Sequence, residues 1–254
     1  MCTVLILLRP EDPWPLLIGA NRDERLDRAF DPPARWWPES PGIIGGRDRA
    51  GGGSWFAFNH DGVVATIVNG LDRLGPQPGK RSRGEIVLRA LREADASSAV
   101  RAIGALSPET YRGFTLLVAD RTTAFVVTND ERGLDTRRLP PGHHMITPDG
   151  CDVPTSPRYL AHFEAFRAAP PPAPGERDWS SWIELLRQVD DDDPHRAMTV
   201  VTDRHFGTVS SALLGLAAGD SAGPELLFAN GPPTRAGYER CAIRWVHAGD
   251  GEHR

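Results

Sequence analysis

An apolar hairpin at the start of the chain sets the tightest limit on what the sequence can fold into. Cys2 to Leu8 is apolar on both faces of a strand, because Val4, Ile6 and Leu8 alternate with Leu5 and Leu7. A strand of this kind is buried on both sides. A turn at Arg9-Pro10-Glu11-Asp12-Pro13 then leads into a return strand over Trp14 to Ala20. The hairpin therefore predicts a sheet in the interior of the molecule, with covering layers on both faces.

The order of the later elements predicts how those layers are built. Residues 31–54 are rich in proline and glycine, and we expect loops there. Helices are expected over Ser82–Glu93, Ala96–Leu106, Ser156–Arg167 and Trp179–Val189. Further strands are expected over Trp55–Phe58, Val63–Val68, Phe114–Val118, Ala124–Thr128, His144–Thr147, Thr208–Leu214, Leu226–Ala229 and Glu239–Val246.

This order does not alternate strand with helix, so it does not predict a parallel sheet. It fits an α+β fold in which two antiparallel sheets pack together and helices cover both outer faces, a four-layer αββα sandwich. Ser82 and Glu85 have the spacing of a capping box at the first helix. The proline-rich stretch at 168–175 is interpreted as an internal connection, so residues 1–254 are expected to form a single domain.

Composition excludes several classes of protein. The net charge of −5 argues against a general binder of nucleic acids or anionic membranes. The three cysteines, Cys2, Cys151 and Cys241, have neither disulfide-framework nor metal-ligand spacing, which favours a reducing compartment. No signal peptide is visible and no apolar run approaches the roughly 20 residues of a membrane span. We therefore expect a cytoplasmic protein without an integral membrane segment.

Cys2 is the first candidate for chemistry. Removal of Met1 would leave Cys2 with a free α-amine, whose reference pKa is about 7.7–8.0, beside a thiol of pKa about 8.5. A nucleophile and a base on one residue suit attack on an amide carbonyl through an acyl-enzyme. The alternative is that Cys2 is simply a small apolar residue in a buried strand.

The second candidate is the segment Asn21-Arg22-Asp23-Glu24, which follows the return strand. Antiparallel pairing would bring it next to Cys2, where a carboxylate could hold the amine. An arginine there could favour the thiolate or bind an acidic group of a substrate. The alternative is a solvated turn of charged residues.

Together these features resemble the NRDE-motif family, the relatives of transport-and-Golgi-organisation proteins. The resemblance extends to Gly52-Gly53-Ser54-Trp55, to Ala65-Thr66-Ile67-Val68-Asn69-Gly70 and, more weakly, to Gly207-Thr208-Val209-Ser210-Ser211. That family is in turn similar to N-terminal-nucleophile (Ntn) hydrolases of the choloylglycine hydrolase and penicillin acylase type.

The resemblance implies the αββα fold and a set of site residues. It implies that Cys2 is the nucleophile, that Asp23 contacts its amine and that Asn69 is an oxyanion-hole amide. For Asn69 the alternative is an ordinary turn residue in Asn-Gly. Asn21, Arg22, Glu24 and Trp55 are the candidates for substrate binding, although core packing is the alternative role for Trp55.

The sequence also departs from the acylase pattern. Ala20 stands where acylases carry an arginine before the asparagine of the hairpin end. Pro148 and Val209 stand at two later positions where acylases and relatives have Asn and Arg. These departures from the pattern predict hydrolase machinery that is incomplete or rearranged.

Two functions follow from the resemblance. The first is hydrolysis of linear amide carbon–nitrogen bonds through Cys2, with a small-molecule amide as substrate. The second is a non-catalytic binding or trafficking protein on the same fold, with haem or an acyl compound as its ligand. No metal site is predicted, because His143 and His144 point to opposite faces of a strand and His205 has no partner at metal-ligand spacing. The substrate and the oligomeric state are left open.

Overall fold

The computed structural model describes residues 2–70, 75–202, 205–219 and 223–243. In this part of the chain the strands form two seven-stranded antiparallel sheets, here sheet A and sheet B. The strands of sheet A, in spatial order, are β11 (Gly150–Cys151), β10 (Gly142–Thr147), β1 (Thr3–Leu8), β2 (Leu16–Arg25), β12 (Phe206–Leu216), β13 (Glu225–Ala229) and β14 (Glu239–Arg240). The strands of sheet B are β3 (Phe30–Ala34), β4 (Ile44–Asp48), β5 (Phe56–Phe58), β6 (Val64–Asn69), β7 (Phe114–Ala119), β8 (Ala124–Asn129) and β9 (Leu134–Leu139).

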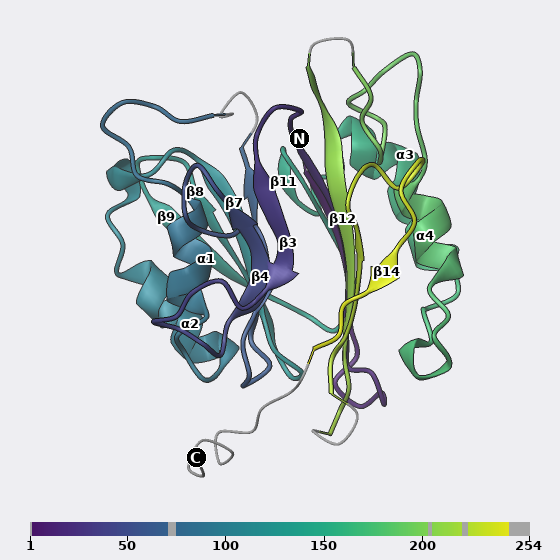
Figure 1. Cartoon of the computed structure of the whole chain (residues 1–254), viewed down its shortest axis with the longest axis horizontal. Coiled ribbons are helices and arrows are strands. Elements are labelled where there is room, and N and C mark those ends of the chain that lie inside the picture. The colour runs from purple at the N-terminus through teal and green to yellow at the C-terminus, as the bar shows by residue number, and fades with distance from the viewer. Residues whose placement is uncertain (1, 71–74, 203–204, 220–222, 244–254) are drawn as a thin grey trace.

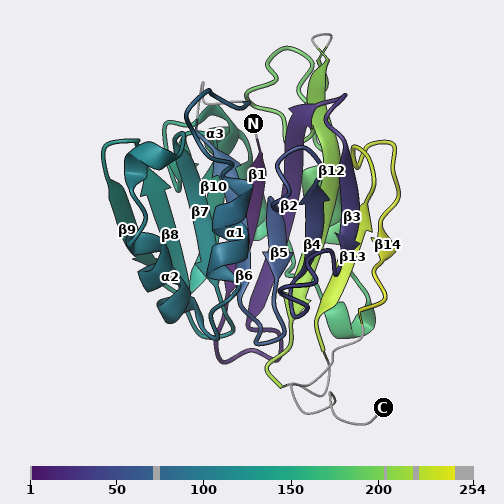
Figure 2. The ribbon, with the colours of Figure 1, turned by 60° about the vertical axis from the view of Figure 1, so that its left-hand side comes forward.

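The two sheets pack face to face, and helices cover both outer faces (Figure 1). Sheet B carries α1 (Gly84–Ala90) and α2 (Ala96–Gly104), whereas sheet A carries α3 (Pro157–Ala168) and α4 (Ser180–Leu186). Two 3₁₀ turns, η1 (Pro108–Thr110) and η2 (Pro174–Glu176), lie in connections. The predicted four-layer αββα sandwich is therefore confirmed. Figure 2 shows sheet B in front of sheet A, with β1 and β2 in the middle of the rear sheet.

The alternation within β1 shows why the chain forms layers. Val4, Ile6 and Leu8 enter the core between the two sheets. Leu5 and Leu7 enter a second core between sheet A and its helices. All five are essentially fully buried. A third core fills the space between sheet B and α1 and α2.

The charged segment after the first hairpin is part of a strand, which corrects the expectation that the strand ends at Ala20. The pairing of β2 with β12 continues to Arg25, which lies opposite Phe206. Asn21, Arg22 and Asp23 are buried. The solvated-turn interpretation of this segment is therefore wrong, because β12 pairs with it from Asn21 to Arg25, with one register shift between Thr208 and Ser210.

Four strands appear where none was predicted, and one of them is the two-residue β11, which pairs with the end of β10. β3 contains Pro32 and Pro33 and lies at the edge of sheet B, where a missing backbone N–H is tolerated. β4 carries Gly45, whose missing Cβ allows close packing on Ala57. β9 is a mostly exposed edge strand without an apolar alternation.

The capping box predicted at Ser82 and Glu85 is also wrong. The helix α1 begins after Arg83, whose side chain makes no capping hydrogen bond. Ser82 Oγ accepts a hydrogen bond from Gly84 N at 3.3 Å, whereas Glu85 N donates to the main-chain oxygen of Ser82. Glu85 instead binds Arg81 and accepts a hydrogen bond from the Tyr111 hydroxyl at 2.5 Å. The closing strand expected over Glu239–Val246 is seen only at Glu239–Arg240, and Val246 lies outside the described residues.

Candidate active site

A pocket of about 290 Å³ is lined by residues of both sheets and lies where β1 begins. Sheet A contributes Cys2 and Arg22 to its lining, and sheet B contributes Asn69. Trp55 and the segment that leads into α1 complete the wall. The pocket brings together residues that are far apart in the sequence and that the sequence predicted as one site.

Cys2 lies at the base of this pocket and is 9% exposed. The pairing of Thr3 with Asn21 places Cys2 opposite Arg22 on the neighbouring strand. The thiol donates a hydrogen bond to the main-chain oxygen of Asp23, at a sulfur–oxygen distance of 3.7 Å. Burial raises the pKa of the Cys2 thiol, and the positive charge of Arg22 opposes that shift. The resting side chain is therefore a neutral thiol.

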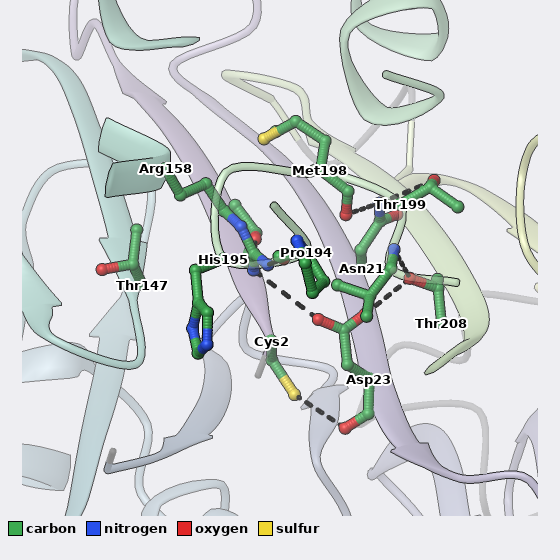
Figure 3. A network of polar contacts seen from close by, with 12 residues as sticks. Cys2, Asn21, Asp23, Thr147, Arg158, Pro194, His195, Met198, Thr199 and Thr208 are labelled. Carbon is green, nitrogen blue, oxygen red and sulfur yellow. Dashed lines mark hydrogen bonds and ion pairs between the residues drawn. The ribbon is translucent and has the colours of Figure 1, made fainter. Parts of the chain in front are cut away.

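Asp23 forms the centre of a buried polar network on the opposite face of sheet A (Figure 3). Its Oδ1 accepts a hydrogen bond from Thr208 Oγ1 at 2.6 Å. Its Oδ2 lies 3.6 Å from Arg158 Nη1, which donates a hydrogen bond to Thr3 Oγ1 at 2.7 Å. Within the part of the chain that the structure describes, Asp23 Oδ2 accepts no hydrogen bond although it is fully buried.

Burial and charge oppose each other in this network. Burial raises the pKa of Asp23, whereas Arg158 and the hydroxyl of Thr208 lower it. Burial likewise lowers the pKa of Arg158, and Asp23 opposes that shift. An acceptor oxygen without a donor in a buried position costs free energy, so Oδ2 is suited to an additional N–H donor near the start of β1.

The alternation of β2 sends Asn21 away from the pocket. Its amide nitrogen donates hydrogen bonds to the main-chain oxygens of Leu186 and Met198, both at 2.9 Å. These bonds tie β2 to the end of α4 and to the segment after it. The structure therefore places Asn21 in the helix-facing layer and not in the lining of the pocket.

Arg22 points into the space between the sheets and is stacked on aromatic rings. Its guanidinium carbon lies 4.0 Å from the centre of the Trp55 ring and 5.2 Å from that of Phe30. Gly46 makes room for this arrangement, because a Cβ there would lie 2.3 Å from the Trp55 indole. Trp55 thus lines the pocket and holds Arg22 at the same time.

Glu24 and Asn69 occupy the pocket in different ways. Glu24 lines it, but its carboxylate lies 3.6 Å from Arg28 Nε and accepts a hydrogen bond from Arg25 N at 2.9 Å. Asn69 is the last residue of β6, lines the pocket and is partly exposed. A side-chain amide in this position can donate to an oxygen of a bound molecule.

The three departures from the acylase pattern lie in different surroundings. Ala20 is buried in the core between the sheets, two residues before Arg22 on the same face of β2. Pro148 follows Thr147, whose hydroxyl lies 3.1 Å from Ser156 Oγ. Val209 is the extra residue of a β-bulge, since Thr208 pairs with Asp23 and Ser210 pairs with Arg22.

Two residues of the network around Asp23 were not predicted from the sequence. Arg158 is 1% exposed and comes from α3, 135 positions after Asp23 in the chain, so no local pattern could reveal it. Thr208 lies in the weakly matched Gly207–Ser211 segment, which is the one signal that could have found it.

The described residues contain no group of three or more His, Cys, Asp or Glu side chains that could hold a metal ion. His143 packs edge-on against Phe166, whereas His144 contacts Asp152 at 2.8 Å on the other face of β10. None of the helices in the described ranges is long and apolar enough to cross a bilayer.

Solved structures with the same architecture define the class of this fold. An N-acylethanolamine-hydrolyzing acid amidase orthologue from Caenorhabditis elegans aligns with a TM-score of 0.55 at 15% identity, over 87% of this chain and 95% of that one. A cysteine-to-alanine variant of conjugated bile acid hydrolase from Clostridium perfringens aligns with a TM-score of 0.50 at 11% identity, over 97% and 98% of the two chains. The protein therefore has an Ntn hydrolase-like fold.

The family follows from the sequence. The family model for Transport and Golgi organisation 2 matches residues 1–170, so the chain belongs to this family. The Transport and Golgi organization protein 2 homologue of Homo sapiens is 30% identical over 133 residues, and that of Mus musculus is 27% identical over 132 residues. The matched region spans 49% of this chain and 47% of each relative.

Proposed function

We propose that the protein hydrolyses linear amide bonds, with Cys2 as an N-terminal nucleophile. The observation that carries this proposal is the position of Cys2 at the start of β1, with its thiol in a pocket and the unsatisfied Oδ2 of Asp23 buried nearby. Removal of Met1 would create an α-amine at the same place. Asp23 Oδ2 would then have the N–H donor that it lacks.

The thiol and the amine would work as a pair. The neutral amine takes the thiol proton as sulfur attacks the substrate carbonyl, so a carbon–sulfur bond forms and the carbonyl oxygen gains negative charge. The ammonium then gives that proton to the leaving nitrogen as the carbon–nitrogen bond breaks. Water hydrolyses the resulting thioester and regenerates Cys2. Because burial keeps the thiol neutral at rest, proton removal by the amine is a necessary part of the attack.

Asn69 would stabilise the oxyanion from the opposite sheet. It lines the same pocket as Cys2, and its side-chain amide can donate to the carbonyl oxygen. Asp23 would orient the amine through Oδ2, while Thr208 fixes the other carboxylate oxygen. Arg22 supplies a guanidinium from the position two residues after Ala20, on the same face of β2.

A covalent probe tests the role of Cys2. An activated acyl ester is incubated with the protein, and the intact mass is measured before and after. We expect a native mass without Met1 and one added acyl group on the wild-type protein. The Cys2→Ala variant should take up none, whereas Cys241→Ala, which removes a half-buried thiol elsewhere, should be acylated like the wild type. Retention of Met1, or equal acylation of Cys2→Ala, would refute the proposal.

The second candidate is a binding or trafficking protein that uses the same pocket without catalysis. The raised pKa of the Cys2 thiol favours it, because a protonated thiol is a poor nucleophile. The presence of Pro148 and Val209 in place of polar acylase residues points the same way.

If the ligand is haem, Cys2 is the candidate for binding its iron. Among the described residues that line the pocket, it is the one whose side chain is Cys, His, Met or Tyr, the types that commonly ligate haem iron. Its thiol would have to ionise first. Titration with haem followed by visible spectroscopy checks this, and an unchanged Soret band on addition of protein would exclude it. The expected reducing cytoplasm would keep the thiol available in either case.

A further inference from the structure

Two buried polar groups near Cys2 have no hydrogen-bond partner among the described residues. One is Nη1 of Arg22, whose residue is 6% exposed, and the other is Oγ of Ser210, whose residue is 1% exposed. An unsatisfied polar group in the interior is costly, most of all when it is charged. Two such groups in one place therefore call for a molecule that bonds to both.

The bulge in β12 is what turns Ser210 toward Arg22. Thr208 pairs with Asp23 and donates to its carboxylate on the helix-covered face of sheet A. After one extra residue, Ser210 pairs with Arg22 and faces the space between the sheets. In a regular strand Ser210 would point the same way as Thr208, because residues two apart share a face. The bulge therefore completes a row of Cys2, Arg22 and Ser210 across three neighbouring segments of sheet A.

The same three residues, Cys2, Arg22 and Ser210, line a cavity of about 10 Å³. Of the other polar residues in its lining, Thr66 donates its hydroxyl to a main-chain oxygen at 3.0 Å, and Asn21 directs its amide to the opposite face of sheet A. The remaining side chains of the described lining are apolar, those of Val4, Ala20, Trp55, Phe56, Ile67 and Ala212. This space is enough for one water molecule and too small for an organic ligand.

One water molecule matches the groups around this cavity. Its oxygen can accept hydrogen bonds from Arg22 Nη1 and Ser210 Oγ, and a hydrogen is then left to donate to the sulfur of Cys2. Three bonds are typical of a buried water. Burial raises the pKa of the Cys2 thiol, so a donor at the sulfur, which favours the thiolate, offsets part of that shift.

We propose that Arg22 and Ser210 bind a single buried water molecule that donates a hydrogen bond to the sulfur of Cys2 and stabilises its thiolate. Ser210 is then a positioning residue, because it acts on the sulfur through the water. This inference rests on the proposed role of Cys2 as nucleophile and adds the group that stabilises its charge. When the α-amine takes the thiol proton, the electron pair stays on sulfur, and no bond of the water breaks.

Other charged groups also act on the thiol of Cys2. Asp23 disfavours its ionisation, whereas Arg158 from α3 and Arg83 before α1 favour it. The α-amine left by removal of the first residue would add a titrating group. Because Ser210→Ala changes none of the charges of the chain, a difference from wild type reports on the hydroxyl and the water that it holds.

Alkylation of Cys2 with iodoacetamide over a series of pH values gives the apparent pKa of its thiol. Peptide mass spectrometry follows this site separately from Cys151 and Cys241. We expect Ser210→Ala to raise the apparent pKa by about one unit relative to wild type, because the water loses one of the two groups that hold it. A hydroxyl that only filled space would leave this pKa unchanged.

Ser211→Ala is the matched control. Ser211 follows Ser210 in β12 and is equally buried, but its hydroxyl donates to Ala20 O at 3.1 Å and lies 2.6 Å from the Tyr238 hydroxyl. Its loss should lower the midpoint of urea unfolding and leave the pKa of Cys2 where it is. An unchanged pKa in Ser210→Ala, or an equal shift in Ser211→Ala, would overturn the proposal.

A high-resolution crystal structure of the wild-type protein checks the water directly. We expect one water within hydrogen-bond distance of Arg22 Nη1, Ser210 Oγ and Cys2 Sγ. This measurement stands even if Ser210→Ala does not fold, and density without a water at this place would also overturn the proposal.

The water site and hydrolysis fail in different ways. A raised pKa in Ser210→Ala, together with a wild-type protein that forms no acyl-enzyme, would keep the water site and refute hydrolysis. Acyl-enzyme formation on wild type with the same pKa in both proteins would keep hydrolysis and refute the water site.

Discussion

At the end of β2, consecutive side chains serve different purposes because a strand alternates its faces. Arg22 enters the space between the sheets beside Cys2, whereas Asp23 enters the layer of α3 and meets Arg158. The main-chain oxygen of Asp23 nevertheless reaches the Cys2 thiol. Asp23 therefore contacts the thiol through its main chain and Arg158 through its side chain, and Arg158 stabilises the carboxylate on the face of sheet A that α3 covers.

Loss of Arg158 tests this arrangement. Arg158→Met leaves the Asp23 carboxylate buried without its cation and removes the hydrogen bond to Thr3. We expect the free energy of unfolding, measured with urea, to fall by about 3 kcal/mol. Adding Asp23→Asn to Arg158→Met should recover part of that loss, because the buried charge disappears. A double variant whose loss equals the sum of the two single losses would mean that the two residues do not interact.

At the scale of elements, the β10–β11 hairpin is closed by a histidine–carboxylate pair. His144 Nδ1 lies 2.8 Å from Asp152 Oδ2, and its Nε2 lies 2.8 Å from Pro140 O. Both ring nitrogens face acceptors, so the protonated ring satisfies both. Burial lowers the pKa of His144, whereas the hydrogen bonds to Asp152 and Pro140 raise it. The hydrogen bonds have the larger combined effect, so the net pKa is raised, although the nearby charge of Arg137 opposes it.

This pair makes the stability of the hairpin depend on pH. Burial raises the pKa of Asp152, yet the bonds from His144 and Met145 N bring it below its usual value. The contribution of His144 is complete below its unfolded pKa of about 6.5 and is lost as pH rises through its folded pKa. That of Asp152 is complete above about pH 4 and is lost as pH falls through its folded pKa.

We therefore expect the pair to stabilise the protein most between these limits. The difference in unfolding free energy between wild type and His144→Gln should shrink by about 1 kcal/mol between pH 5.5 and pH 8.5. Urea denaturation at several pH values measures it, with His162→Gln as control. His162 is half-buried and its Nε2 contacts Arg196 O at 2.7 Å. Because burial lowers the pKa of His162, its contribution to stability should not shrink as pH rises. A difference that is the same at both pH values would contradict the interpretation.

A strand can be predicted from the sequence when its side chains are buried, because burial leaves an apolar pattern. A strand held only by backbone hydrogen bonds to its neighbour leaves no such pattern. β1 and β6 were predicted because both their faces are buried and apolar. β3 and β9 were missed because edge strands are held by backbone bonds to one neighbour and need no apolar pattern. Cys2 and Asn69 were predicted from motifs, whereas Arg158 acts on Asp23 through tertiary contacts that only the fold creates.

At the scale of the whole molecule, the region that matches the family model ends before the last strands of sheet A begin. It matches residues 1–170, but β12 (Phe206–Leu216) lies next to β2 and pairs with it from Arg25 to Leu16. Thr208, which binds Asp23, also lies beyond the matched region. We therefore propose that residues 1–254 form one domain, in which the C-terminal strands complete sheet A and the network behind the pocket.

A shortened chain tests this proposal. Residues 1–170 alone would expose the buried edge of β2 and the apolar faces that α4 and β12 cover. We expect this fragment to aggregate or to unfold without a cooperative transition in urea. Co-expression with residues 171–254 should restore a cooperative transition, because the second fragment supplies β12 and α4. A fragment 1–170 that unfolds cooperatively by itself, with a midpoint like that of the full chain, would show that the region matched by the family is an independent domain.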